Sequence, residues 1–172
     1  MWRRHWRITT VIAVQLLILA AVPGRKVLAR IHGTDVTLET RPVDPYDVMS
    51  GYYVTLGYKA EDAPLAPGFH PDDGATVYIT VARGTPAWRG VAVTADPIPP
   101  EADQVSLKAT WDGRRARLLD AQRLYVPEAE RFKVTEAFRA AASPAVADLK
   151  VDSGGAVALL RLHVNGHTWG DR

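Results

Sequence analysis

The sequence predicts a mainly β domain, a small barrel or sandwich of about eight strands, with one helix in its C-terminal half and a transmembrane helix before it. From residue 34 onward, short runs of β-branched and aromatic residues alternate with turn signals. One later segment has helical periodicity instead. The first thirty residues contain an uncharged apolar run between basic flanks and no acid. We therefore expect two parts, a membrane anchor with its flank over 1–30 and a β-rich domain over 31–172.

The expected anchor begins with a basic, tryptophan-containing start and continues with the uncharged apolar run Ile8–Val22. This run is shorter than the about 20 residues that a spanning helix needs, but Trp6–Gly24 approaches that length. A cleaved signal peptide is the main alternative, and a buried soluble helix is the third. The sequence that follows lacks a clear small-x-small cleavage site and turns basic at once, which favours an uncleaved anchor.

The uneven distribution of charge decides which partners are expected. The formal net charge is +2, but residues 1–30 hold six of the 21 Lys and Arg, leaving 15 against all 19 acidic residues in the rest. A nucleic-acid-binding domain needs a basic footprint, so no nucleic acid is expected as partner. Basic residues flank the apolar run almost equally, and His5 with the N-terminal amine slightly favours an inside N-terminus. The expectation is a single-pass cell-membrane protein with an extracytoplasmic body.

The β elements follow one another along the body. The expected strands are Asp35–Thr40, Tyr52–Tyr58, Thr76–Ala82, Trp88–Ala95, Gln104–Trp111, Arg114–Ala121, and one strand on each side of Asn165-Gly166. Asp112-Gly113 and Asn165-Gly166 are strong signals for two-residue hairpins. The proline-rich connector 96–103 is stiff, and it offers a possible division of the body into two β subdomains.

One segment, Pro127–Ser143, has the pattern of a helix. Acidic residues lie near its start, and apolar residues recur at i, i+3, i+4 and i+7 from Val134. Pro144 is the expected stop signal. We expect this helix to cover the β domain.

The stretch VDPYDVMSGYYVTLGY (43–58) reads as turns followed by a strand. Asp44-Pro45 and Ser50-Gly51 are turn signals, and the strand begins after them. A period of two separates the side chains of this strand into two faces. The expected core face is Tyr52, Val54, Leu56 and Tyr58, and the opposite face is Tyr53, Thr55 and Gly57. No nucleophile with a neighbouring base emerges from this geometry.

The same stretch resembles the motif of the GDYXXLXY family, a bacterial group for which the resemblance implies no particular reaction. PVDPYD (42–47), HGTDVTLET (32–40), LYVPEAE (124–130) and ALLRLHVNG near the C-terminus are similar to other family segments. The resemblance covers about residues 8–170, including the apolar N-terminal segment. Ten residues are thereby indicated as structural or binding positions: Asp44, Pro45, Asp47, Gly51, Tyr53, Leu56, Tyr58, Tyr125, Pro127 and Glu128.

This chain departs from the family motif at one functional candidate. Tyr52 stands where the family has Asp, and Ser50 stands where a basic residue is usual. If that Asp were a catalytic acid or a metal ligand, this chain would lack it. If the Asp only caps the turn, Ser50 or Asp47 can substitute for it. We favour the capping role.

Most catalytic and cofactor motifs are missing from the sequence. The absence of cysteine excludes disulfides, thiolate metal sites and a cysteine nucleophile. There is no phosphate-binding glycine loop and no Gly-x-Ser-x-Gly, so no cofactor is expected. His163 and His167 have a spacing that suits zinc on a helix, but the hairpin register predicts that they lie on opposite faces. No metal site is expected.

Two polar regions are the candidate binding surfaces. The long loop Lys59–Ala75 carries the candidate binding residues Glu61, Asp62, His70, Asp72 and Asp73. Ca²⁺ could use such carboxylates, although a solvated acidic loop without metal is the favoured interpretation. The second region is the face shared by Arg115 and Arg117, which fits an anionic surface or, more simply, solvent.

The function predicted from these features is a membrane-anchored binding or scaffold module for an envelope or membrane protein. The alternative is a membrane-surface hydrolase whose acids are the loop carboxylates. A third possibility, a small-ligand sensor, would require an apolar pocket in the β domain.

Overall fold

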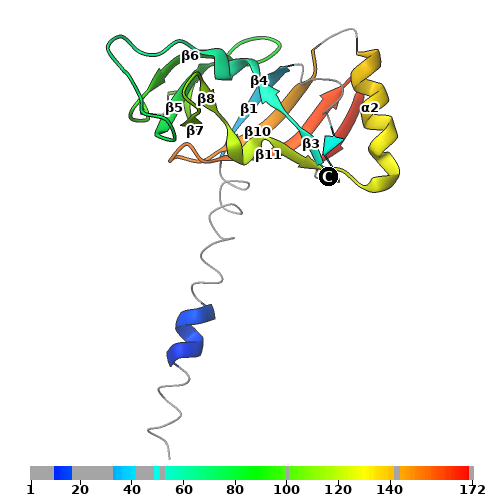
Figure 1. The fold of residues 1–172 in the computed structure, drawn as a ribbon, viewed down its shortest axis with the longest axis horizontal. Coiled ribbons are helices and arrows are strands. Elements are labelled where there is room, and N and C mark those ends of the chain that lie inside the picture. Colours follow the sequence, from blue (N-terminus) through cyan, green and yellow to red (C-terminus); the bar gives the residue numbers. More distant parts are fainter. Residues whose placement is uncertain are drawn as a thin grey trace, which may run out of the picture.

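The computed structural model describes residues 10–16, 33–41, 49–50, 53–99, 101–141 and 144–170. Residues 10–16 are helical, and the rest form a mainly β domain with a single longer helix, α2 (Arg131–Ala140) (Figure 1). None of the helices in these described ranges is both long and apolar enough to cross a membrane. Most of the predicted span Trp6–Gly24 lies outside them.

The largest sheet has five antiparallel strands in the order β12-β11-β10-β1-β4. Its strands are β1 (Thr34–Arg41), β4 (Gly57–Tyr58), β10 (Val146–Val151), β11 (Val157–Val164) and β12 (His167–Gly170). Buried and half-buried side chains alternate along β1 and β10, as in a sheet with one face on the core. Asn165 and Gly166 both have positive φ (47° and 79°), which confirms the predicted two-residue hairpin.

A three-stranded sheet continues this layer. It contains β2 (Met49–Ser50), β3 (Tyr53–Thr55) and β9 (Arg123–Tyr125), in the order β2-β3-β9. The single strand predicted over Tyr52–Tyr58 is therefore two short strands, β3 and β4, separated by Leu56. Because the Leu56 N–H donates to the carbonyl of Gln122, just before β9, the chain passes from one sheet to the other without leaving the layer. The two sheets together form a half-barrel with β12 at one end and β9 at the other.

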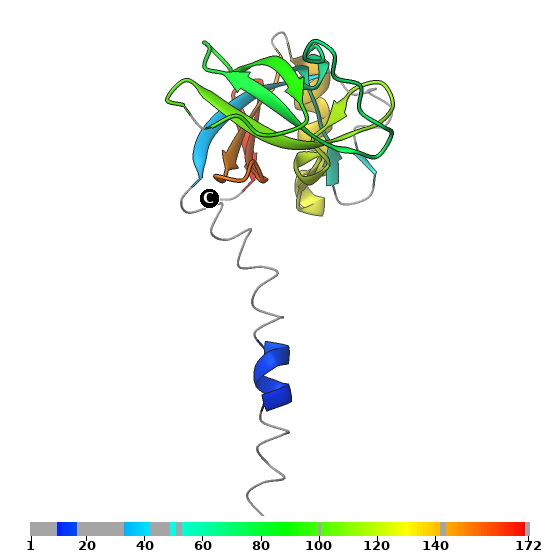
Figure 2. The ribbon, with the colours of Figure 1, turned by 90° about the vertical axis from the view of Figure 1, so that its left-hand side faces the viewer.

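The third sheet has four strands in the order β6-β5-β7-β8. They are β5 (Thr76–Ala82), β6 (Arg89–Thr94), β7 (Gln104–Trp111) and β8 (Ala116–Arg117). The Trp88 N–H donates to Thr37 O (2.8 Å) and the Lys108 N–H to Gly155 O (2.7 Å), so this sheet packs against the half-barrel (Figure 2). The connector 96–103 joins β6 to β7, which lie on either side of β5, so a subdomain boundary there would cut this sheet.

Of the strand predicted over Arg114–Ala121, only Ala116–Arg117 is confirmed. The side chain of Asp112 accepts hydrogen bonds from the N–H groups of Arg114 and Arg115, which makes the turn longer than two residues. After the short β8, the chain forms the 3-10 helix η2 (Leu119–Ala121).

Three strands of the half-barrel, β2, β9 and β10, were not predicted. β10 is the centre of the five-stranded sheet, and its sequence VADLKV has the period of two that could have identified it.

The predicted helix is confirmed in shorter form. The 3-10 helix η3 (Glu128–Glu130) leads into α2, and Val134 and Ala137 are buried as the periodicity required. The helix packs on β11.

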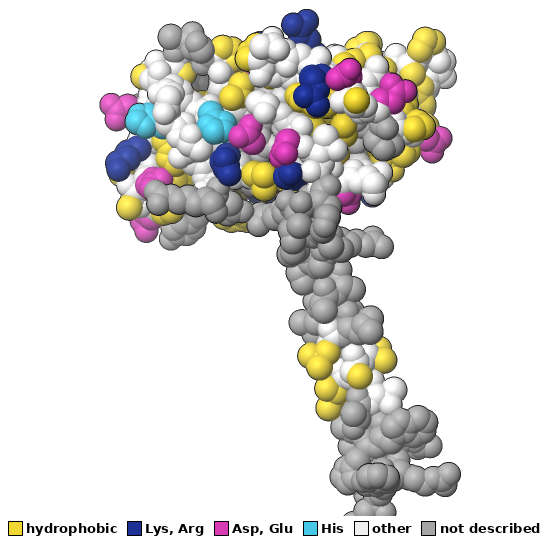
Figure 3. All heavy atoms as spheres, turned by 180° about the vertical axis from the view of Figure 1, so that it is seen from behind, with side chains coloured by type: hydrophobic (Ala, Val, Ile, Leu, Met, Phe, Trp, Pro, Cys, Tyr) yellow, Lys and Arg dark blue, Asp and Glu magenta, His cyan; other side chains and the backbone are white. Residues whose placement is uncertain are grey.

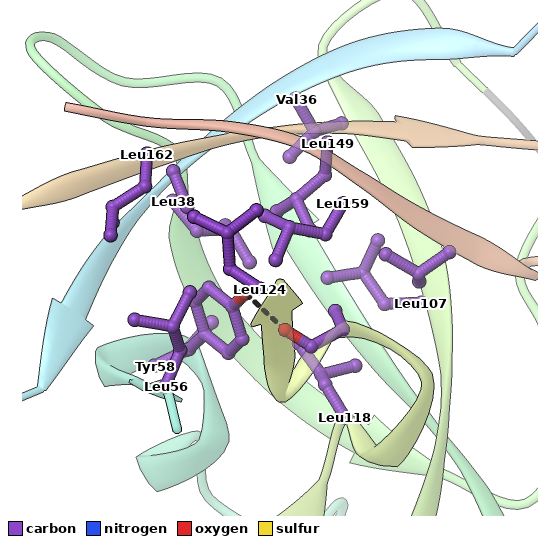
Figure 4. Packing of buried hydrophobic residues seen from close by; sticks show 14 of the residues in the cluster. Val36, Leu38, Leu56, Tyr58, Leu107, Leu118, Leu124, Leu149, Leu159 and Leu162 are labelled. Carbon is purple, nitrogen blue, oxygen red and sulfur yellow. Dashed lines mark hydrogen bonds between the residues drawn. The ribbon is translucent and has the colours of Figure 1, made fainter. Parts of the chain in front are cut away.

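One buried cluster contains side chains from all three sheets and α2. Figure 4 shows part of it, including Leu38, Leu149 and Leu162 of the five-stranded sheet and Leu107 of the four-stranded sheet.

Candidate functional site

The two segments that resemble the family meet at the pairing of β3 with β9. Tyr53 and Tyr125 are partners in register, and their rings form an edge-to-face pair with centroids 6.1 Å apart. The guanidinium of Arg123 lies 4.9 Å from the centroid of the Tyr53 ring, within cation–π distance. The segments around 53–58 and 123–127 are therefore one structural unit, although 64 residues lie between them in the sequence.

The inner side of this unit belongs to the core. Leu56 and Tyr58 are fully buried, as the predicted face assignment required. The Tyr58 hydroxyl donates to Ala121 O (2.7 Å), the hydrogen bond dashed in Figure 4. Burial, with a smaller contribution from the nearby Glu61 carboxylate, raises the pKa of Tyr58 far above its ordinary value. The hydroxyl is therefore a permanent donor, and its role here is structural.

Glu61 was expected in a solvated loop, and this expectation is wrong. It lies on the 3-10 helix η1 (Lys59–Asp62) and is only 1% exposed. One carboxylate oxygen accepts the Leu118 N–H (3.0 Å), and the other lies 3.8 Å from Arg117 Nε. Burial raises the pKa of Glu61, while the Leu118 hydrogen bond and the Arg117 charge oppose that rise. The carboxylate therefore links η1 to the segment that follows β8 through this hydrogen bond.

The arginines considered as a separate face belong to the same arrangement. Arg117 Nη1 lies 3.7 Å from Asp112 Oδ2, and Arg115 Nη1 lies 3.9 Å from Asp62 Oδ1. Asp62 also forms an ion pair with Arg41 of β1. Three arginines thus alternate with three carboxylates, so this surface offers no excess positive charge to an anionic ligand.

The remainder of the candidate loop is partly used to cover β6. The Val93 N–H donates to Pro64 O (2.8 Å), and the Ala66 N–H donates to Val93 O (2.9 Å). His70, Asp72 and Asp73 follow and are exposed. Within the described part of the chain, no three His, Asp or Glu side chains are grouped so as to hold a metal ion. The structure does not bring the five candidate loop residues together as one site.

A hollow lies beside β12. A cleft of about 910 Å³ is lined by β9, residues Val126 and Pro127, and parts of β11 and β12. A second cleft of about 470 Å³ continues it between α2 and β12. Both clefts share Glu130, Thr168 and Trp169. We call the two together the β12 groove.

The walls of the groove differ in polarity. Leu124, Leu159 and Trp169 line it and also belong to the buried cluster, so they provide an apolar floor. Tyr125 lines it as well and is 71% exposed. An exposed aromatic ring beside an apolar floor is typical of a binding surface. Sequence reasoning missed Trp169, although a tryptophan directly after a hairpin turn was a visible signal.

The predicted arrangement of the two histidines is confirmed. His163 pairs with Thr168 and Val164 with His167, so the imidazoles point to opposite faces. On the outer face, His163 Nδ1 is 2.9 Å from Thr168 Oγ1 and Nε2 is 2.7 Å from Asp148 Oδ2. Figure 3 shows acidic, basic and histidine side chains intermixed on the molecule seen from behind. The His163 contacts could not be predicted from the sequence, because Asp148 lies on β10, which was not predicted.

Several family positions lie outside the described residues: Asp44, Pro45, Asp47 and Gly51, together with the divergent Tyr52. Pro127 and Glu128 are exposed at the start of η3, and Pro127 lines the groove.

No curated protein and no solved structure matches this chain. The family model described as GDYXXLXY protein matches residues 15–162, which include both segments joined at β3 and β9. Since that match spans most of its length, the chain belongs to the GDYXXLXY family.

Proposed function

We propose that this protein is a binding module for an envelope or membrane protein, that the β12 groove is its binding surface, and that the N-terminal segment holds it at the membrane. The exposure of Tyr125 carries the proposal. Its neighbours Leu124 and Val126 are buried, while Tyr125 lines the groove, is largely exposed and packs its ring on Tyr53. A large side chain on a rigid strand loses little conformational freedom on binding, so it suits an anchor for a partner.

The alternative, a hydrolase that uses loop carboxylates, has less support from the geometry. Glu61 is buried against Leu118 and Arg117, and Asp62 is paired with Arg41. An acid that protonates a substrate must reach it. Neither carboxylate lines the β12 groove.

The proposed site can be tested with a matched pair of exposed aromatic residues. Tyr125 lines the groove, whereas Phe132 is 81% exposed on α2 and lines neither cleft. Full-length protein carrying Tyr125→Ser or Phe132→Ser is used to capture partners from detergent-solubilised membranes, with identification by mass spectrometry. The partner should be lost with Tyr125→Ser and retained with Phe132→Ser. Equal retention by both variants would show that the groove is not the binding surface.

A third variant tests the candidate loop. His70, Asp72 and Asp73 are exposed, so their combined replacement by alanine should leave the fold unchanged. Capture should persist in this variant. Its loss, with capture retained by Tyr125→Ser, would move the site to the loop.

Membrane attachment is a separate part of the proposal. The support is the apolar sequence Trp6–Gly24, which approaches the length of a membrane span. After cell fractionation, the protein should resist extraction from membranes by alkaline carbonate. Recovery in the wash, or a mature N-terminus near Arg25, would contradict the anchor.

A further inference from the structure

The free edge of β12 presents its main chain to the groove. Val164 and His167 flank the two-residue turn and form a hydrogen-bonded pair, so the next pair, His163 with Thr168, is a non-hydrogen-bonded one. In such a pair the N–H and C=O groups point away from the partner strand. The N–H and C=O of Thr168, and by the same alternation the N–H of Gly170, therefore point away from β11. Among the described strands, β12 has only β11 as a neighbour.

The groove extends along this whole edge. His167, Thr168 and Trp169 line its smaller cleft, and Thr168, Trp169 and Gly170 line its larger one. The opposite wall consists of β9, Pro127 and the start of the helical segment. β9 is itself the last strand of the other end of the half-barrel. The groove thus lies between the two terminal strands of the half-barrel.

We propose that the β12 groove takes up an extended polypeptide segment of the partner, which pairs with the edge of β12 and lies as an added strand between β12 and β9. The inference rests on the proposed function of the groove as a binding surface. Strand addition to an exposed sheet edge is an established mode of peptide recognition, with affinity from the main chain and specificity from alternate side chains. Here the main-chain groups of Thr168 and Gly170 at the free edge supply the hydrogen bonds that provide the affinity.

The walls of the groove specify the kind of segment. Leu124, Leu159 and Trp169 lie on the core side, so every second side chain of the partner strand should be apolar. Arg123 and Thr168 are exposed, so the intervening side chains should be polar. All pairings within the layer are antiparallel, so β12 and β9 run in opposite directions. A segment antiparallel to β12 is then parallel to β9.

Backbone amide exchange on the free, full-length protein tests the edge directly. The Thr168 N–H should exchange at least about tenfold faster than the Trp169 N–H, because only the latter belongs to a hydrogen-bonded pair with Leu162. Equal and strong protection of both amides would mean that the edge is already covered, and it would overturn the inference.

Binding is tested with a phage-displayed library of short random peptides, selected on the full-length protein in detergent. Enriched peptides should show apolar residues at alternate positions, and binding should protect the Thr168 and Gly170 amides. Thr168→Pro removes the edge N–H and should weaken binding at least about tenfold, while Thr168→Val keeps that N–H and should bind as the wild type does. The valine variant also shows that loss of the hydroxyl near His163 is not the cause.

A scan of N-methylated peptides gives an independent result if the proline variant does not fold. Methylation at alternate amides should abolish binding, and methylation at the amides between them should not. Peptides with helical spacing that bind in the groove without protecting Thr168 would overturn strand addition but leave the proposed function intact. Failure to enrich any peptide that depends on Tyr125 would contradict both.

Discussion

The loop Lys59–Ala75 and the segment Arg123–Pro127 reverse what their compositions suggest. The loop is rich in acidic residues, yet it begins with the buried Glu61 and pairs with Val93 of β6. The second segment is largely apolar, yet it places Tyr125 at the surface. The difference arises from neighbours: arginines compensate the carboxylates of η1, whereas β9 has no strand on its far side among the described residues.

This comparison shows that a polar loop can be part of the structural support, while an apolar strand can provide the surface for a partner. Residues of the family motif contribute both to the structural support and to the surface for a partner. Leu56 and Tyr58 support the core beneath η1, and Tyr53 supports Tyr125.

The largest effect is expected at Leu56, which lies between the two regions. Leu56→Asp should unfold the domain, because it buries an unpaired carboxylate in a packed core. Thr55→Ser, at a half-buried neighbour, should change the melting temperature little. Thermal melts of the two full-length variants in detergent measure their melting temperatures. Equal tolerance of both substitutions would mean that the faces of this strand are misassigned.

A smaller loss of stability is expected when the buried carboxylate of Glu61 is removed. Glu61→Ala should destabilise the fold by about 3 kcal/mol, because the Leu118 N–H loses its acceptor and Arg117 loses a partner. Glu61→Gln retains an acceptor and should be less destabilising. Chemical denaturation provides the free energies of unfolding. If Glu61→Ala left the free energy of unfolding unchanged, the loop Lys59–Ala75 would not contribute to the stability of the fold.

The same residue predicts a pH dependence. Burial raises the pKa of Glu61 in the folded state, so the folded protein binds more protons than the unfolded chain between the ordinary and the raised pKa. The contribution of Glu61 to stability is therefore greatest below its ordinary pKa, and it falls as the pH rises toward the raised value. The Glu61→Gln variant should lack this decrease. An identical pH profile in both proteins would contradict the assignment.

Tyr58 should show a more modest effect. Tyr58→Phe removes the donor to Ala121 O but keeps the ring, so a loss of about 1 kcal/mol is expected. Denaturation curves at neutral pH measure it. Binding of the partner should be unaffected, since Tyr58 lines neither cleft.

Tyr125 should show the smallest effect on stability. Tyr125→Ser is expected to shift the unfolding free energy by no more than about 0.5 kcal/mol, because most of the side chain is already in water. The same denaturation curves provide this free energy of unfolding. A large destabilisation would mean that Tyr125 belongs to the support and not to the binding surface.

The sequence predicted the parts of the fold that follow from local patterns. The burial of Val54, Leu56 and Tyr58, the two-residue turn at Asn165-Gly166 and the periodicity from Val134 each follow from patterns visible within a few residues. The break at Leu56 and the pairing of β3 with β9 depend on contacts between distant segments, so no local pattern contained them. The groove was missed for the same reason, since its walls come from β9, β11, β12 and α2.

The burial of Glu61 was also beyond local patterns, because its compensation comes from residues more than 50 positions away. A carboxylate in an acidic segment is normally solvated. The contacts with Leu118 and Arg117 contribute to reversing that expectation.

Site-specific photo-crosslinking in intact membranes tests most directly whether the groove segment or the loop contacts the partner. A benzophenone amino acid is placed at Tyr125 in one protein and at Asp72 in another, both exposed positions in the free chain. We predict a covalent adduct with a membrane or envelope protein from position 125 and none from position 72. An adduct from position 72 alone would contradict the assignment of the β12 groove as the binding surface.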